Sequence, residues 1–221
     1  SFTSDIGVDT AAGFYFAVIS NQINDHAVLV RGQIGSAAAP TAVVTFPTAA
    51  IVNTIEVDAV NRKIYVGSQD GAGIPDGSIT GIRVYSYDAA GAVTDNGFLT
   101  TAVSDNRADE SGYYVLDPQD FALDSSIGRL FYTERVDGLA AGVFRLDLSN
   151  PNIHTQLVSQ SQFPDGGSYF GDIEVDESTD LVYFVTHSQN PSGGGNYTAA
   201  ENALWYISEN ASSGTATKVT L

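Results

Sequence analysis

The chain has 221 residues, and 43% of them are apolar, which is enough for a sizeable core. Its 26 acidic and 9 basic side chains give a net charge of −17. Such a surface repels the phosphates of nucleic acids and anionic lipids, while it attracts cations and basic partners. We therefore expect no nucleic-acid partner.

Three further features of the composition bound the class of protein. There is no cysteine, which excludes disulfides, thiolate metal sites and cysteine nucleophiles. No 18-residue apolar run occurs, so we expect no insertion into a membrane. The chain starts at Ser1 and contains no Met, which favours a mature or excised piece of a larger product. The 22 Gly, 11 Tyr and 11 Phe favour strands and turns over long helices.

A five-residue pattern recurs four times along the chain. Each copy reads Asp or Thr, an apolar residue, any residue, Val or Leu, and Asp, and an aromatic residue follows seven positions later. The copies are 5–9 with Phe16, 54–58 with Tyr65, 120–124 with Phe131, and 172–176 with Tyr183. Below, the first residue of each copy is its leading residue and the last is its closing aspartate.

The pattern predicts a β-hairpin at the start of each repeat. Apolar residues alternate within each copy, as in a strand with one buried face. The closing aspartates Asp9, Asp58, Asp124 and Asp176 precede turn-forming residues, and a second apolar run follows each of them. Because these aspartates recur in every repeat, we interpret them as turn formers and not as ligands.

Two further strands are predicted in each repeat, after loops of variable length. The third strands are 27–30, 82–87, 142–146 and 203–207. The fourth strands are 42–46, 97–100, 154–158 and 215–219. Four strands in a repeat of about 50 residues match the size of a β-propeller blade. We predict an all-β fold, with one propeller domain over 1–221 and blades at approximately 4–47, 53–101, 119–160 and 171–221.

The segments 55–65 and 121–132, with 142–147 after the second, resemble the repeats of YWTD and NHL-like propellers. In that family an apolar-x-apolar-Asp strand precedes an aromatic-rich second strand. The family usually closes six blades, whereas four repeats are present here. Three arrangements follow: a four-bladed ring, part of a larger propeller, or an open array completed by another chain.

The leading residues form the first candidate site. In a propeller the first strands line the central channel, so their starts converge at one mouth. Asp5, Asp120 and Asp172, with Glu174 two residues further along its strand, would gather carboxylates there, and Asp oxygens suit Ca²⁺. One hypothesis is therefore a calcium site. The alternative is that each Asp caps its own turn or accepts hydrogen bonds from backbone amides of the next blade.

A longer segment, 104–114, separates the second repeat from the third. Its Asp109, Tyr113 and Tyr114 could form a binding surface for a protein or carbohydrate, because long propeller loops commonly carry function. A solvated insertion is the alternative for this segment.

We expect an extracellular, non-enzymatic propeller module of a larger secreted or surface protein, of bacterial and adhesin-like type. Its composition, with few Lys and abundant Asp and Gly, favours this interpretation. The first alternative is a calcium-dependent hydrolase similar to propeller lactonases, in which Asp172, Glu174 and His187 are the residues of interest. The second is an architectural subunit that pairs through its blade edges with further blades or chains of the same assembly.

Overall fold

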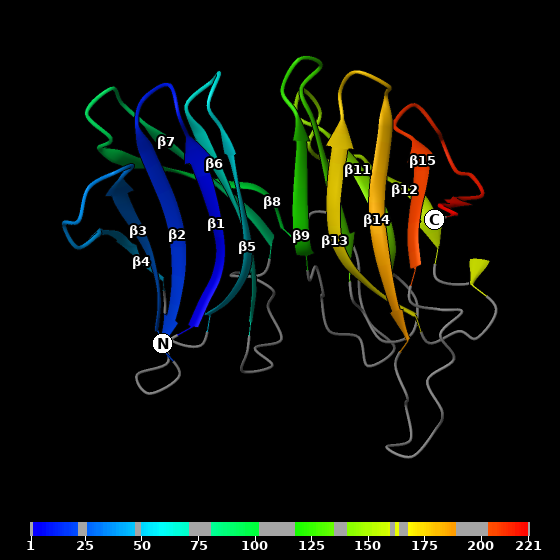
Figure 1. The fold of residues 1–221 in the computed structure, drawn as a ribbon, viewed down its shortest axis with the longest axis horizontal. Helices are drawn as coiled ribbons and strands as arrows, with labels where there is room; N and C mark the ends of the chain where they lie inside the picture. The colour runs from blue at the N-terminus through cyan, green and yellow to red at the C-terminus, as the bar shows by residue number, and fades with distance from the viewer. Residues whose placement is uncertain are drawn as a thin grey trace. The chain divides into compact units, whose positions relative to one another are not determined.

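The computed structural model describes residues 2–21, 26–46, 50–70, 81–101, 118–134, 141–159, 162–163, 168–188 and 203–220. The regular elements of this part of the chain are all strands (Figure 1). No helix among these residues is long and apolar enough to cross a membrane. The chain forms two compact units, Ser1–Pro118 and Gln119–Leu221, and each contains two four-stranded antiparallel sheets.

The first unit contains the first and second blades. The first blade has the strands β1 (Phe2–Asp9), β2 (Phe14–Asn21), β3 (His26–Gln33) and β4 (Thr41–Thr45). The second blade has the strands β5 (Ala50–Asp58), β6 (Lys63–Asp70), β7 (Gly81–Tyr87) and β8 (Val93–Thr101).

The second unit contains the third and fourth blades. The third blade has the strands β9 (Pro118–Asp124), β10 (Arg129–Glu134), β11 (Gly142–Asp147) and β12 (His154–Ser159). The fourth blade has the strands β13 (Ser168–Asp176), β14 (Leu181–Ser188), β15 (Ala203–Ser208) and β16 (Thr217–Lys218).

In every sheet the strands lie side by side in chain order. A four-stranded antiparallel meander of this kind is the building block of a β-propeller. The predicted fold class, all-β with four propeller blades, is confirmed.

The hairpin between the first two strands has the same construction in all four blades. Oδ1 of the closing aspartate accepts the backbone N–H of a residue two or three positions later: Ala12 (2.8 Å), Asn61 (2.9 Å), Ser126 (2.9 Å) and Ser178 (2.9 Å). The fourth residue after the aspartate has a left-handed backbone, with φ of 76° at Gly13, 53° at Arg62, 68° at Gly128 and 57° at Asp180. The interpretation of the closing aspartates as turn formers is confirmed.

A β-bulge interrupts the first strand of three blades beside the leading residue. The register shifts between Thr3 and Asp5 in β1, between Val52 and Thr54 in β5, and between Phe170 and Ile173 in β13. A bulge adds one residue to one strand and re-aims the side chains next to it. The bulge therefore determines the direction of the leading residue in these three blades.

Each unit is held together by one hydrophobic core between its two blades. In the first unit, Phe16, Val18 and Leu29 of the first blade belong to one buried cluster with Ile55 and Val57 of β5. In the second unit, the corresponding cluster joins residues of the third blade, such as Phe131 and Val143, to Ile173 and Phe184 of the fourth. One face of a blade thus packs on the first strand of the next blade within the unit.

Candidate functional site

Asp5 connects the first blade to the second. Its Oδ2 accepts a hydrogen bond from the backbone N–H of Ile55 (2.9 Å) and another from the hydroxyl of Thr54 (3.0 Å). Its Oδ1 accepts the N–H of Ile6 (2.7 Å). Since Thr54 is the leading residue of the second blade, a side-chain hydrogen bond joins the leading residues of two adjacent blades.

Asp120 makes the same connection in the second unit. Its Oδ2 accepts the backbone N–H of Ile173, the residue after the leading residue Asp172, at 2.9 Å. In both units, a leading aspartate therefore accepts a hydrogen bond from the equivalent backbone amide of the following blade. The sequence predicted either calcium binding or a structural role, in which the aspartate accepts hydrogen bonds from backbone amides of the next blade. The structural role is confirmed for Asp5 and Asp120.

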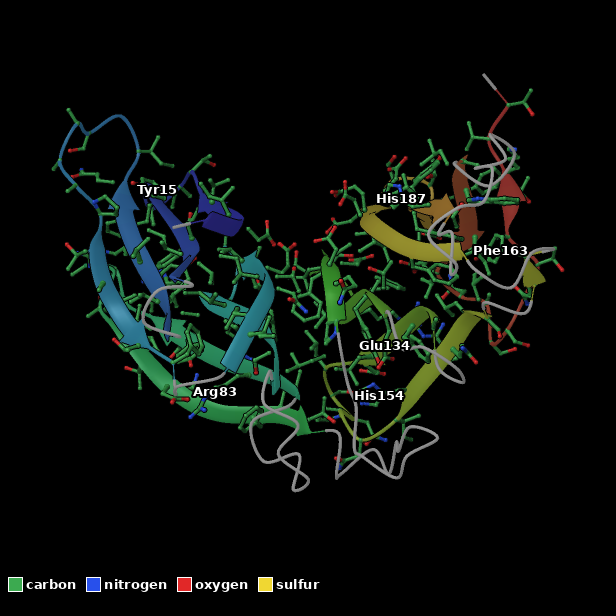
Figure 2. All side chains as sticks on the ribbon, turned by 90° about the horizontal axis from the view of Figure 1, so that it is seen from below. Tyr15, Arg83, Glu134, His154, Phe163 and His187 are labelled. Carbon is green, nitrogen blue, oxygen red and sulfur yellow. The ribbon has the colours of Figure 1, made fainter. Side chains whose placement is uncertain are left out.

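Asp172 and Glu174 lie on β13, on either side of the buried Ile173, and both are exposed. His187, labelled in Figure 2, lies on β14, where it pairs in register with Tyr169. Its ring lies over the bulge, because a Cβ atom added to Gly171 would be only 2.6 Å from Nε2 of His187. The structure thus brings His187 to the same end of this hairpin as Asp172.

The calcium hypothesis stays a prediction. No group of three acidic or histidine side chains with metal-binding geometry occurs among the residues that the structure describes. The predicted binding surface of Asp109, Tyr113 and Tyr114 lies outside those residues.

A second set of inter-blade contacts involves the closing aspartates. The Tyr87 hydroxyl, at the end of β7, donates a hydrogen bond of 2.8 Å to Oδ2 of Asp9 in the turn of the first blade. Burial disfavours the ionised form of Asp9, but the hydrogen bonds from the Ala12 amide and Tyr87 outweigh it and hold the pKa of Asp9 below its usual value. Burial and the same hydrogen bond raise the pKa of Tyr87.

Glu209 occupies the position of Tyr87 in the second unit. The register pairs Lys63 with Ser86 and Leu181 with Ser208, so the next residues, Tyr87 and Glu209, are equivalent. Burial and the nearby carboxyl group of the closing aspartate Asp124 raise the pKa of Glu209. Sequence reasoning found neither Tyr87 nor Glu209, because the repeat pattern ends before this position and the two residues differ in type.

Within the first unit, apolar residues on one face of the first blade are not covered. Ile6 and Val8 on β1, which we name the leading face, are 56% and 51% exposed. The equivalent residues of the second blade, Ile55 and Val57, are 3% and 8% exposed because the first blade covers them. The same repeat position is therefore core in one blade and surface in the other.

Comparison with solved structures places the chain among β-propellers. It matches a hydrazine synthase of Kuenenia stuttgartiensis (TM-score 0.59, 11% identity), over 99% of this chain and 54% of that one. It matches a putative TolB of Agrobacterium tumefaciens (TM-score 0.58, 11% identity), over 100% and 62%. It also matches a GH74 enzyme of Niastella koreensis (TM-score 0.62, 12% identity), over 99% and 30%.

The chain spans less than two thirds of each of these three proteins. At such identities the likeness shows the fold alone, and propellers of this architecture carry unrelated functions. Neither a scan against protein-family models nor a search of curated proteins found a match, so the specific resemblance to YWTD and NHL-like repeats gains no support from them.

Proposed function

We propose that this chain is a non-enzymatic β-propeller module of a larger secreted or surface protein, in which it mediates binding or structural assembly. The observation that carries the proposal is the leading face. Ile6 and Val8 are exposed at positions where the second blade buries Ile55 and Val57. An apolar sheet face of this kind is a docking surface for another sheet.

The occupant that fits the leading face is a further blade of the same protein. Within the first unit, the surface that covers Ile55 and Val57 is the face of the preceding blade, with Phe16, Val18 and Leu29. The leading face presents the same alternation of apolar residues on the equivalent strand, so the same kind of surface complements it. This chain spans 54%, 30% and 62% of the three proteins compared above.

The roles of the leading aspartates agree with an assembly function. Asp5 and Asp120 use a carboxylate oxygen to hold the backbone of the following blade. Their recurrence is accounted for by the repeated joint between blades. The net charge of −17 supports partners that are basic or cationic.

The experiment compares Ile6→Asp with Ile55→Asp, two substitutions at one repeat position. In the 221-residue chain, we expect Ile6→Asp to change the free energy of unfolding by less than about 0.5 kcal/mol, as at an exposed site. Ile55→Asp places an unpaired charge in the core and should cost about 3 kcal/mol or more. In the longer protein, both substitutions should be strongly destabilising.

Two results would contradict the proposal. One is an Ile6→Asp variant of the 221-residue chain that is destabilised as much as the Ile55→Asp variant, since Ile6 would then be covered within this chain. The other is a longer protein in which Ile6→Asp has no effect, since no blade would then cover the leading face.

A further inference from the structure

The joint between the third and fourth blades contains two buried carboxyl groups. Asp124 and Glu209 are both 2% exposed. Oδ1 of Asp124 accepts the backbone N–H and the hydroxyl of Ser126, at 2.9 and 2.6 Å. Oε1 of Glu209 accepts a hydrogen bond from Nη1 of Arg129 at 3.1 Å. The carboxyl group of Asp124 disfavours the ionised form of Glu209, because buried like charges repel each other unless a proton or a cation compensates them.

The second carboxyl oxygen of Glu209 is the unusual atom. Oε2 is buried and receives no hydrogen bond from any described residue. An ionised carboxylate can only accept hydrogen bonds, so an ionised Glu209 would bury an acceptor without a donor. A protonated Glu209 is a donor, and its neighbour Asp124 is an acceptor.

We propose that Glu209 and Asp124 share one proton, which Oε2 of Glu209 holds and donates to Asp124, and that this proton ties the fourth blade to the third. The joint is therefore tighter in mildly acidic solution than at neutral pH. The inference does not depend on the function proposed above, because both carboxyl groups lie within the second unit.

The charged groups around Glu209 come from several elements. Arg129 on β10 shares its Nη1 between Glu209 and Oδ1 of Asn210 (2.7 Å). Arg145 on β11 donates to the backbone oxygen of Glu209 at 2.6 Å, and not to its carboxyl group. Asp180, in the turn between β13 and β14, accepts the backbone N–H of Glu209 through its own backbone oxygen at 3.0 Å. Arg129 is thus the ion-pair partner of Glu209, and its single positive charge lies beside two carboxyl groups, those of Glu209 and Asp124.

The direction of the pH effect follows from these surroundings. Burial and Asp124 raise the pKa of Glu209 above its usual value of 4.5, while Arg129 opposes the shift. A group whose pKa is raised by folding stabilises the folded state when it is protonated, and this contribution is lost as the pH rises through the raised pKa. Acidification from neutral pH towards 4.5 should therefore stabilise the second unit.

The equivalent joint in the first unit gives an internal comparison. There the partner of the closing aspartate is Tyr87, whose hydroxyl is a permanent donor over the pH range in which carboxyl groups titrate. In the first unit, the proton between the two blades belongs to the Tyr87 hydroxyl and does not titrate in this pH range. In the second unit, it belongs to the Glu209 carboxyl group and does titrate.

The direct test is an NMR titration of the side-chain carboxyl carbons of the 221-residue chain. We expect the Glu209 signal to titrate with a midpoint above 4.5. A midpoint at or below 4.5 would overturn the proposal. This measurement needs no substitution, so it does not depend on the folding of any variant.

A second test uses Trp205, the only tryptophan in the chain, which lies on β15 in the second unit. Urea unfolding followed by its fluorescence measures the equilibrium constant for unfolding. As the pH is lowered from the midpoint of Glu209 to 4.5, this constant should fall by up to about tenfold for each pH unit. Glu209→Gln keeps a donor towards Asp124 without a titratable proton, so it should remove this dependence and increase stability at neutral pH.

Glu174→Gln is the matched control, because Glu174 is an exposed carboxylate of the same blade. It should keep the pH dependence of the unsubstituted chain. If Glu209→Gln and Glu174→Gln both keep that dependence, then other groups cause it and the shared proton is excluded.

Discussion

The Tyr87 hydroxyl donates a hydrogen bond of 2.8 Å to Oδ2 of Asp9, across the joint between the first and second blades. Asp9 simultaneously orders its own turn through the Ala12 amide. One buried carboxylate thus serves both the hairpin of its own blade and the attachment of the next.

Tyr87→Phe should destabilise the first unit by about 1–3 kcal/mol, because it leaves a buried carboxylate oxygen without its donor. The substitution should also raise the pKa of Asp9, which this hydrogen bond helps to lower. A lowered pKa contributes stability that is lost as the pH falls through it, so the variant should lose stability at a higher pH on acidification. Thermal melting followed by circular dichroism at several pH values measures both effects. An unchanged acid transition would contradict this role of Tyr87.

Asp5→Ala should remove two inter-blade hydrogen bonds and Asp120→Ala should remove one. Each variant leaves a backbone amide unpaired, at a cost of about 1–3 kcal/mol. The two variants control each other, because they act in different units. Only Asp120→Ala should lower the unfolding midpoint reported by Trp205 fluorescence. Equal effects of both variants on that signal would show that the hydrogen bonds are not local to their units.

Arg62→Gly and Asp180→Gly should stabilise the hairpins of the second and fourth blades by about 0.5–1 kcal/mol. Arg62 and Asp180 have a left-handed backbone, which costs an L-residue roughly 1–2 kcal/mol, whereas glycine adopts it readily. Gly128→Ala, at the same turn position of the third blade, is the reverse change and should destabilise. Urea unfolding curves for the three variants test the prediction, which fails if all of them shift in one direction.

Calcium addition tests the hypothesis of a metal site formed by Asp5, Asp120, Asp172 and Glu174. A cation that binds only the folded state raises the melting midpoint. If the hypothesis is correct, excess Ca²⁺ raises the midpoint of the second unit, and Asp172→Asn with Glu174→Gln removes the increase. A midpoint that calcium leaves unmoved argues against the site, and so does an increase that survives both substitutions.

The repeat could be predicted because its determinants are local. The closing aspartates and the aromatic residues seven positions later lie within one hairpin, and the structure buries Asp9 and Phe16 together with Asp58 and Tyr65. Turn formation depends on the four residues that follow each aspartate. These residues are adjacent in the sequence, so the turn could be predicted without knowledge of the tertiary structure.

The contacts between blades could be predicted only in part. The role of Asp5 and Asp120 as acceptors for the next blade was one of two alternatives, and the sequence alone could not choose between them. The bulge beside the leading residue was not foreseen, because a single inserted residue leaves the alternation of the pattern intact on both sides. Tyr87 and Glu209 were missed because their partners lie in another blade and share no residue type with each other.

The absence of cysteine makes thiol labelling the most direct test of the central claim, that a further blade covers the leading face. An Ile6→Cys variant of the 221-residue chain should react rapidly with a maleimide, and the same variant of the longer protein should be protected. Ile51→Cys is the control, since Ile51 on β5 is 43% exposed and should react in both. Equal reactivity of the Ile6→Cys variant in the two proteins, or its protection in the 221-residue chain alone, would contradict the account.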